Sequence, residues 1–314
     1  MVQAALGKLA LTPLVLLGWI YALSPGFIRV AMAWVVGRIP KLFKYRESVA
    51  QQNLKYAFPG ESSAVEKLRD SVLGSSYLHL GHLFLEICMT IGPFCAMPFF
   101  VRRNTEFSGY HHWEKAIQQG VGLIFIGTHV GSWEVMAAAG AMRGIDNLLM
   151  TKVLKPAWLH DWMEKGRVRS GVRAAYEPKT LQAVMKQLKR GGAVGVVMDQ
   201  YAGAPIGVRV PLFGIPVGTS SVGAALARRT NVPVLPIVNY RVKGGRFRVE
   251  IRPPVPLDES QPSRELAVNT AHYVAAVEPD IKSHPDQWLW IHRRFKGDLG
   301  PLRPDEWDRP RARQ

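Results

Sequence analysis

The sequence predicts an α/β fold in which a central sheet, mixed but mostly parallel, is flanked by helices on both faces (an α/β/α sandwich). Continuous apolar runs such as Gly122–Gly127 (GLIFIG) and Ala193–Met198 (AVGVVM) are typical of parallel strands that are covered on both faces. Segments with apolar residues at helical spacing alternate with these runs, and Ser62–Thr90 is the longest of them. Strands that alternate with helices favour a parallel sheet.

The predicted elements alternate along the chain. Helices are expected at 62–90, 111–119, 132–142, 156–166, 178–190, 219–230 and 264–283, and strands at 122–127, 147–151, 193–198, 234–240 and 247–251. Ser132 is expected to cap the helix that it begins. The chain has no GxGxxG or GxxxxGKS/T segment, so it lacks the usual phosphate loops of nucleotide-binding proteins.

Composition narrows the class of protein. The chain has 314 residues, of which 47% are hydrophobic, and this share excludes a disordered polyelectrolyte. Two cysteines, Cys88 and Cys95, exclude a disulfide scaffold, and we expect buried thiols in a reduced, cytosolic body. The net charge of +16 is typical of proteins that bind either nucleic acid or an anionic membrane.

A run of twenty residues without a charged side chain, 9–28, lies near the start of the chain. A helix of this length crosses a hydrocarbon core of about 30 Å. Pro13 and the Ser24-Pro25-Gly26 break favour a shorter helix, a turn and a second apolar segment. The sequence predicts a membrane anchor at 1–40, either a spanning helix or an interfacial helical hairpin. A buried core helix is the alternative, and a cleaved signal peptide is disfavoured because no good A-x-A site follows.

The charges beside this run predict its orientation. Lys8 stands alone before it, whereas five basic residues follow before the first acidic one: Arg29, Arg38, Lys41, Lys44 and Arg46. An excess of Lys and Arg marks the cytoplasmic side of a membrane segment. We therefore expect a body at 41–300 on the cytoplasmic side of the membrane, and a loose Pro/Arg/Asp-rich tail at 301–314.

One segment, 128–134 (THVGSWE), has the features of a catalytic site. His129 follows the predicted strand at 122–127, and active groups collect at the carboxyl ends of parallel strands. Glu134 falls in the first turn of the next helix. Gly131 allows a turn that folds the Glu134 carboxylate back to the imidazole. Such a carboxylate stabilises the imidazolium, while the other ring nitrogen accepts a proton from a hydroxyl. By spacing alone, an accidental pair remains the alternative.

The HVGSWE segment resembles the H-x4-D/E motif of the lysophospholipid acyltransferase superfamily. The rest of the chain is similar to one branch, the lipid A late acyltransferases (the lauroyl/myristoyl acyltransferase family). This resemblance covers residues from about 10 to 297. The other matching blocks are 53–59 (NLKYAFP), 166–170 (GRVRS), 199–200 (DQ), 210–214 (VPLFG) with Thr219, and 285–296 (PDQWLWIHRRFK).

The resemblance implies a membrane-anchored acyltransferase with its catalytic domain at 41–300. It would move a fatty acyl group from a thioester, normally on acyl carrier protein, to a hydroxyl of a phosphorylated lipid A precursor. His129 would be the general base and Glu134 its partner, with no covalent acyl-enzyme, no metal and no cofactor besides the thioester substrate. The membrane, the carrier protein and the glycolipid would then be the partners of the basic surface, rather than nucleic acid.

Three further residues match the family's blocks as substrate-binding residues. Arg169 is expected to face acceptor phosphate or the thioester oxygen, and a solvated helix-end charge is the alternative. Asp199 matches the family's strand-end acid, and a cap is the alternative. Arg294 is expected to pair with a lipid phosphate or the carrier's phosphopantetheine, and a structural ion pair is the alternative.

Other functions stay open at this point. The acceptor could be a mannosylated phosphoinositide or an aminolipid with acyl-CoA as donor, and the acyl length is undetermined. A thioesterase or phospholipid hydrolase could use the same histidine, but the chain has no GxSxG nucleophile elbow. A non-catalytic membrane-binding module would leave HVGSWE without a role.

His79 and His82 stand three residues apart without further ligands, so we expect packed histidines rather than a metal site.

Overall fold

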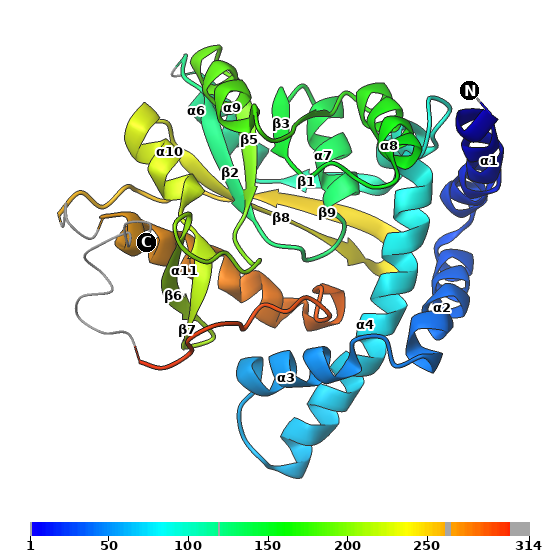
Figure 1. Ribbon diagram of the computed structural model, residues 1–314, viewed down its shortest axis with the longest axis horizontal. Coiled ribbons are helices and arrows are strands. Elements are labelled where there is room, and N and C mark those ends of the chain that lie inside the picture. Colours follow the sequence, from blue (N-terminus) through cyan, green and yellow to red (C-terminus); the bar gives the residue numbers. More distant parts are fainter. Residues whose placement is uncertain (1, 119, 261–264, 302–314) are drawn as a thin grey trace.

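The computed structural model describes residues 2–118, 120–260 and 265–301, and its centre is a seven-stranded sheet with helices on both faces (Figure 1). The strand order is β1 (Thr105–Ser108), β9 (Arg246–Ile251), β8 (Val234–Val242), β2 (Leu123–Gly127), β5 (Ala193–Val197), β3 (Asn147–Met150) and β4 (Arg173–Ala175). Every neighbouring pair is parallel except β8 and β9. The predicted mixed, mostly parallel sheet is confirmed. The predicted tail at 301–314 lies, apart from residue 301, outside the described residues.

The two central strands bring their carboxyl ends to one level. Leu123 of β2 is opposite Ala193 of β5, and Gly127 is opposite Val197 at the other end. All five residues of β2 are buried, as its continuous apolar run predicts. The residues that follow β2 and β5 therefore lie side by side at this edge of the sheet.

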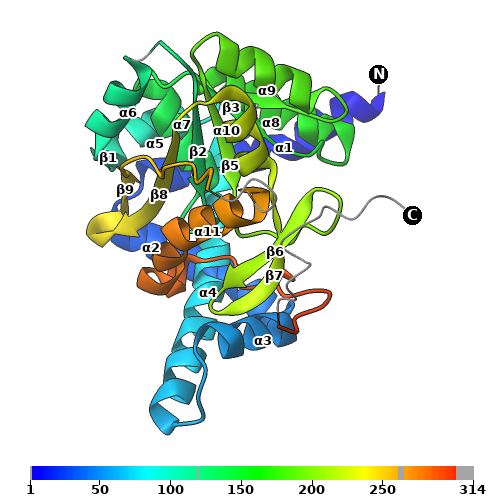
Figure 2. The ribbon, with the colours of Figure 1, turned by 90° about the vertical axis from the view of Figure 1, so that its left-hand side faces the viewer.

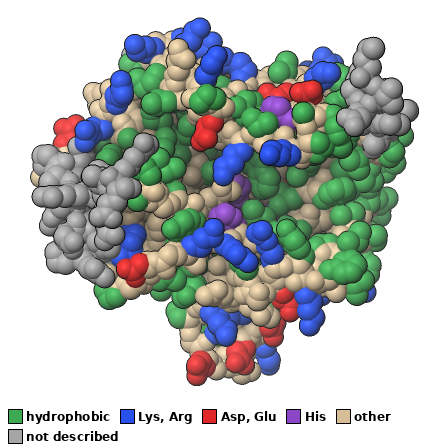
Figure 3. Space-filling model, in the orientation of Figure 1, with side chains coloured by type: hydrophobic (Ala, Val, Ile, Leu, Met, Phe, Trp, Pro, Cys, Tyr) green, Lys and Arg blue, Asp and Glu red, His purple; other side chains and the backbone are tan. Residues whose placement is uncertain are grey.

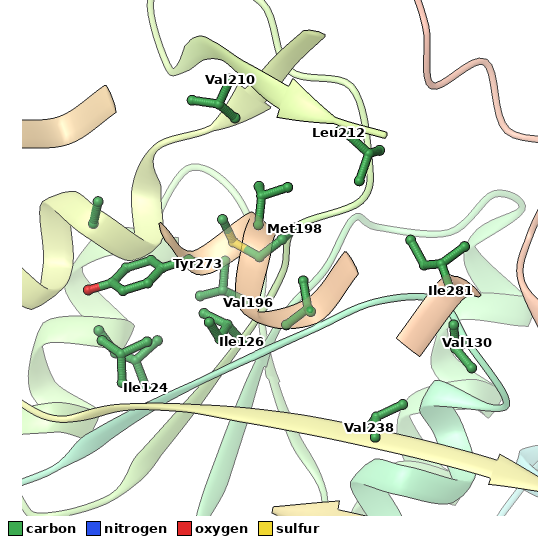
Figure 4. Close-up of a cluster of buried hydrophobic side chains, with 14 of the residues drawn as sticks. Ile124, Ile126, Val130, Val196, Met198, Val210, Leu212, Val238, Tyr273 and Ile281 are labelled. Carbon is green, nitrogen blue, oxygen red and sulfur yellow. The ribbon is translucent and has the colours of Figure 1, made fainter. Parts of the chain in front are cut away.

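Each face of the sheet has its own hydrophobic core. On one face, Phe125 and Leu235 pack with helices that include α4 (Ser63–Thr90), α5 (Met97–Asn104) and α7 (Trp133–Met142). On the other face, Ile124 and Val194 pack with a second set of elements, part of which Figure 4 shows. This second set consists of α3 (Glu47–Ala57), α9 (Thr180–Lys189), α10 (Val222–Thr230), α11 (Glu265–Ser283) and the hairpin of β6 (Gly207–Leu212) and β7 (Ile215–Ser220).

The β6–β7 hairpin, which Figure 2 shows beside α11, differs from the prediction. We expected a helix from residue 219, but Thr219 pairs with Val208 and the helix α10 begins at Val222. Positive φ angles at Phe213 (54°) and Gly214 (78°) form the turn. The short edge strands β1 and β4 were also not predicted, because three or four half-buried residues carry little periodic signal.

The N-terminal apolar run forms two helices, α1 (Val2–Leu23) and α2 (Gly26–Leu42), which lie along α4 in Figure 1. In the part of the chain that the structure describes, no helix combines the length and apolarity that crossing a membrane requires. The predicted spanning helix is therefore not supported. The run is divided at Ser24-Pro25, and Tyr21, Ala22 and Ala33 are buried against the rest of the protein. The packing is close: a Cβ atom on Gly81 of α4 would lie 1.9 Å from the carbonyl oxygen of Ala33.

Buried polar side chains join these helices to the body. The hydroxyl of Tyr21 on α1 lies 2.7 Å from Nδ1 of His82, and Glu86 of α4 binds the Arg241 guanidinium at 2.6 and 2.9 Å. Arg241 also lies 2.8 Å from Nδ1 of His79. Both histidines are thus packed, as predicted. Desolvation is the main cause that lowers the pKa of His82 to about 2, so its ring is neutral at ordinary pH. The two cysteines are free and buried, also as predicted.

Candidate active site

His129 lies two residues beyond β2, in a loop that is held from both sides. Gly131 has a φ of 69°, and a Cβ atom there would lie 2.2 Å from the backbone oxygen of Asn239, so only glycine fits. The Asn239 side chain accepts from the N–H of Ser132 (3.2 Å) and donates to its carbonyl (2.8 Å). The N–H of Gly131 donates to the carbonyl of Gln287 (2.9 Å). The loop thereby holds the His129 ring in one place.

Asp199, immediately after Met198 at the end of β5, is the hydrogen-bond partner of His129. Its Oδ1 accepts from Nδ1 of the imidazole at 2.7 Å, and its Oδ2 accepts from the backbone N–H of His129 at 2.6 Å. The indole N–H of Trp288 donates to the same Oδ2, also at 2.6 Å. The carboxylate is buried, and three donors fix its orientation.

Glu134 does not contact the imidazole. Its two oxygens accept from Arg167 of α8 (Ala157–Arg169), with Oε1 at 2.6 Å from one terminal nitrogen and Oε2 at 3.2 Å from Nε. Both side chains are buried, and a bidentate guanidinium compensates a buried carboxylate well. The prediction that Glu134 partners His129 is therefore wrong: Glu134 is held in a separate ion pair and Asp199 takes its place.

The charges of this pair shift both pKa values. Burial alone would lower the pKa of His129, but the charge and hydrogen bond of Asp199 outweigh it and raise the pKa above 6.5. Burial alone would raise the pKa of Asp199, but the imidazolium charge and the surrounding donors lower it to about 2. Asp199 is consequently ionised throughout the physiological range, and it stabilises a proton on His129.

The second ring nitrogen of His129 is accessible. The side chain is 12% exposed, and the amide of Gln200 donates to Nε2 over 3.2 Å. Because Nδ1 donates to Asp199, Nε2 carries the lone pair. The ring also lies edge to face against Trp133, with 5.2 Å between the centroids. A hydroxyl that replaced the Gln200 amide would thus meet a proton acceptor.

An apolar cavity opens beside this nitrogen, between the sheet and α7. Figure 3 shows a hollow lined by hydrophobic side chains next to a histidine, with Lys and Arg side chains around its mouth. The lining comes from β2, β3, β5, α7 and their flanks, and it includes His129, Trp133, Met136, Leu149, Arg167, Gly195 and Ile237. The site therefore places a proton acceptor at the opening of a space suited to an apolar chain.

Arg169 and Arg294, both predicted to bind substrate, lie elsewhere. Arg169 ends α8 as an exposed residue, and Arg167, two residues earlier, faces the cavity instead. Arg294 is fully buried, where its guanidinium donates to Gly218 (2.5 Å) and Thr219 (2.6 Å). Desolvation lowers its pKa to about 10. Neither residue is among those that line this cavity, and their binding of substrate stays a prediction.

Comparison with known proteins identifies the family. The family model for the bacterial lipid A biosynthesis acyltransferases matches residues 9–297. The chain belongs to this family. It is 28% identical over 293 residues to the lipid A biosynthesis lauroyltransferase of Escherichia coli, covering 88% of this chain and 85% of that one. It is also 28% identical over 288 residues to the palmitoleoyltransferase of the same organism (88% of each chain). A Haemophilus influenzae lipid A acyltransferase is 25% identical over 290 residues (87% and 83%).

Membership confirms the resemblance seen in the sequence and makes the chain an acyltransferase of the lipid A family, with a glycolipid acceptor. Sequence reasoning found His129 and placed Asp199 at a strand end, but it did not pair them, and it missed Arg167, Trp288 and Asn239. Arg167 and Trp288 lie in blocks that the resemblance had already singled out, at 166–170 and 285–296. No group of three or more His, Cys, Asp and Glu side chains in the described ranges is arranged to hold a metal ion.

Proposed function

We propose that the protein transfers a fatty acyl group from acyl carrier protein to a hydroxyl of a phosphorylated lipid A precursor, with His129 as general base and Asp199 as its orienting partner. The observation that carries this proposal is the His129–Asp199 pair, 2.7 Å apart, at the mouth of an apolar cavity. A proton acceptor beside a chain-shaped space suits acyl transfer to an alcohol.

In the proposed reaction the acceptor hydroxyl replaces the Gln200 amide at Nε2. The hydroxyl proton moves to Nε2 as the oxygen attacks the thioester carbonyl, and Asp199 stabilises the imidazolium that forms. The tetrahedral intermediate collapses with cleavage of the C–S bond, and the thiolate takes the proton from Nε2. The nucleophile is the substrate itself, so the protein forms no covalent intermediate.

The ion pair of Glu134 and Arg167 acts as a positioning element in this scheme. It joins the start of α7 to α8 across one wall of the cavity. Arg167 also lies 3.3 Å from Glu164 and from the hydroxyl of Tyr176. A hydrogen-bonded cluster built around this buried ion pair holds the Trp133 end of the cavity in shape.

The outer surface of α1 and α2 supports binding to the membrane surface. Of the twenty large exposed hydrophobic side chains in the described part of the chain, twelve lie between Leu16 and Tyr45. Phe27 (76% exposed), Trp34 (53%) and Leu42 (79%) are examples, with Arg38 and Lys41 among them in the sequence. Figure 3 shows these helices as a margin rich in hydrophobic side chains. Helices with apolar side chains and nearby basic residues lie in the plane of anionic interfaces.

We therefore propose interfacial attachment at the inner membrane, with the active site on the cytoplasmic side. The net charge of +16 fits the partners of this scheme, since an anionic bilayer, a phosphorylated glycolipid and an acidic carrier protein all attract a basic surface. In this scheme the donor and the acceptor would reach His129 through the opening of the cavity that His129 lines.

The test is acyl transfer in vitro from acyl carrier protein or from coenzyme A to a purified lipid A precursor, followed by mass spectrometry of the lipid. We expect transfer from the carrier protein, and a loss of about 10²–10⁴-fold in His129→Ala. Wild-type turnover in His129→Ala would contradict the role of the base. Transfer only to a phosphoinositide or an aminolipid, or only from coenzyme A, would replace the proposed acceptor or donor.

A further inference from the structure

Two glycines of the cavity have no backbone reason to be glycine. Gly195, in the middle of β5, and Gly140, inside α7, do not have a positive φ. A Cβ atom on Gly195 would first meet the side chain of Leu149 at 3.4 Å, and one on Gly140 would meet that of Asn147 at 3.4 Å, which are ordinary contacts. Glycine inside a strand or a helix costs stability relative to alanine. What these two residues provide is empty space.

The register of the sheet shows how deep in the cavity each lining residue lies, measured from His129. Gly127 and Val197 form the row at the carboxyl end, near His129. Phe125, Gly195 and Leu149 form a row two residues deeper. Gly195 is partly exposed although it lies in the centre of a covered sheet, so the surface that it exposes is that of the cavity.

Asn147 lies at the deep end, in the row of Leu123 and Ala193. Its side chain is pinned, because Nδ2 donates to the carbonyl of Ala137 in α7 at 3.0 Å. The residue is 8% exposed, and its Oδ1 has no hydrogen-bond partner among the described residues. Methylene groups of a bound chain that extended this far would cover the unpaired amide oxygen, which is unfavourable.

We propose that Asn147, Gly140 and Gly195 determine the length of the acyl chain that the enzyme accepts, with Asn147 as the floor. This inference rests on the proposed function, since it takes the cavity as the acyl site. From Asn147 to residue 151 the strand spans about 13 Å at about 3.3 Å per residue. An extended chain advances about 3.5 Å for every three bonds, so a saturated chain of about ten to twelve carbons fills the cavity.

The family alone leaves this length open, because the names of its E. coli members specify lauroyl and palmitoleoyl groups. The depth of a substituted residue in the cavity should also determine by how many carbons the accepted chain is shortened. Gly195 lies two rows above Asn147, so a side chain there shortens the space by about 6.6 Å, or about five to six carbons. A methyl group on Gly140 fills space only at the floor and removes room for one carbon or two.

The experiment is calorimetric binding of saturated fatty acids of graded length, used below their micelle concentrations, with the full chain. We compare wild type, Gly140→Ala and Gly195→Val. Gly223→Ala is the matched control: Gly223 lies in α10 on the other face of the sheet, and its Cβ atom would lie 3.9 Å from Ile126, Met198 and Tyr273. In wild type, affinity should rise about fourfold per methylene and then level off near twelve carbons.

The plateau should come about five to six carbons earlier in Gly195→Val and slightly earlier in Gly140→Ala, and it should stay at the wild-type length in Gly223→Ala. Gly140→Ala should be at least as stable as wild type, since alanine favours the helix, and this separates a loss of room from a loss of fold. The same plateau in all four proteins would overturn the proposal. Graded binding without transfer to any lipid A precursor would contradict the proposed function alone, because binding of free fatty acid needs no acceptor.

Discussion

The carboxylate of Asp199 holds the imidazole of His129 from the end of the neighbouring strand, with 2.7 Å between Oδ1 and Nδ1. The two residues are 70 positions apart in the chain, and the parallel pairing of β2 and β5 brings them together. The same carboxylate is bonded to Trp288 near the other end of the chain. Three distant segments thus build one proton acceptor.

Asp199→Asn should lower the turnover number by about 10²–10⁴-fold, because the amide no longer stabilises the imidazolium. It should also move the acidic limb of the pH–rate profile. As the proposed base, His129 would act in its neutral form. Asp199 raises its pKa above 6.5, so wild-type activity should fall as the pH drops through that raised value. Without the carboxylate the pKa decreases, and the limb moves to lower pH. An unchanged limb, measured as turnover against pH, would contradict the pairing.

Glu134→Gln should act mainly on stability. It removes the nearer and more buried of the two carboxylates that pair with Arg167 and leaves only Glu164, and breaking a buried pair costs about 3–5 kcal/mol. The double variant Glu134→Gln/Arg167→Met, which removes both charges, should recover much of this loss in urea unfolding. If Glu134→Gln folds with wild-type stability but loses turnover and shifts the pH profile as Asp199→Asn does, then Glu134 acts on His129 after all.

Phe27→Glu should weaken binding to anionic vesicles. Phe27 is 76% exposed in the first turn of α2, where an acidic residue suits the helix, so the fold should persist. Loss of one apolar side chain that the membrane interface would bury costs about 1.5–3 kcal/mol of binding free energy, or at least about tenfold in affinity. Leu181→Glu, at a 57% exposed position on α9, is the matched control. Equal losses for the two variants in a sedimentation assay would argue against α1 and α2 as the attachment surface.

Arg294→Gln should destabilise the protein without changing how the enzyme recognises phosphate. Its two hydrogen bonds are buried, and bonds to a charged group contribute about 1.5–3 kcal/mol each. We expect the free energy of unfolding to fall by a few kcal/mol, while the ratio of KM values for phosphorylated and dephosphorylated acceptors stays at the wild-type level. A selective rise in KM for the phosphorylated acceptor would restore the role that the sequence suggested.

The class of fold, the central strands and the position of His129 at a strand end all follow from local features of the sequence. Continuous apolar runs such as 122–127 report burial on both faces, and this signal is local. His129 could be located because the end of a parallel strand is a special place in any such sheet. The family was equally visible, because its motif and blocks are short stretches in a constant order.

Three features depend on how distant segments come together in the folded chain: which carboxylate reaches His129, which arginine lines the cavity and what the N-terminal helices pack on. Asp199 and Glu134 both follow a central strand closely in the sequence, but Arg167 binds the Glu134 carboxylate, whereas the Asp199 carboxylate lies beside the imidazole. The apolar run at 9–28 would have the same composition whether lipid or protein covers it, because removal of apolar side chains from water is favourable in both cases. The contacts of α1 and α2 with α4 show that part of that run packs on protein. Pairings between distant segments are set by side-chain direction and packing, which local periodicity does not encode.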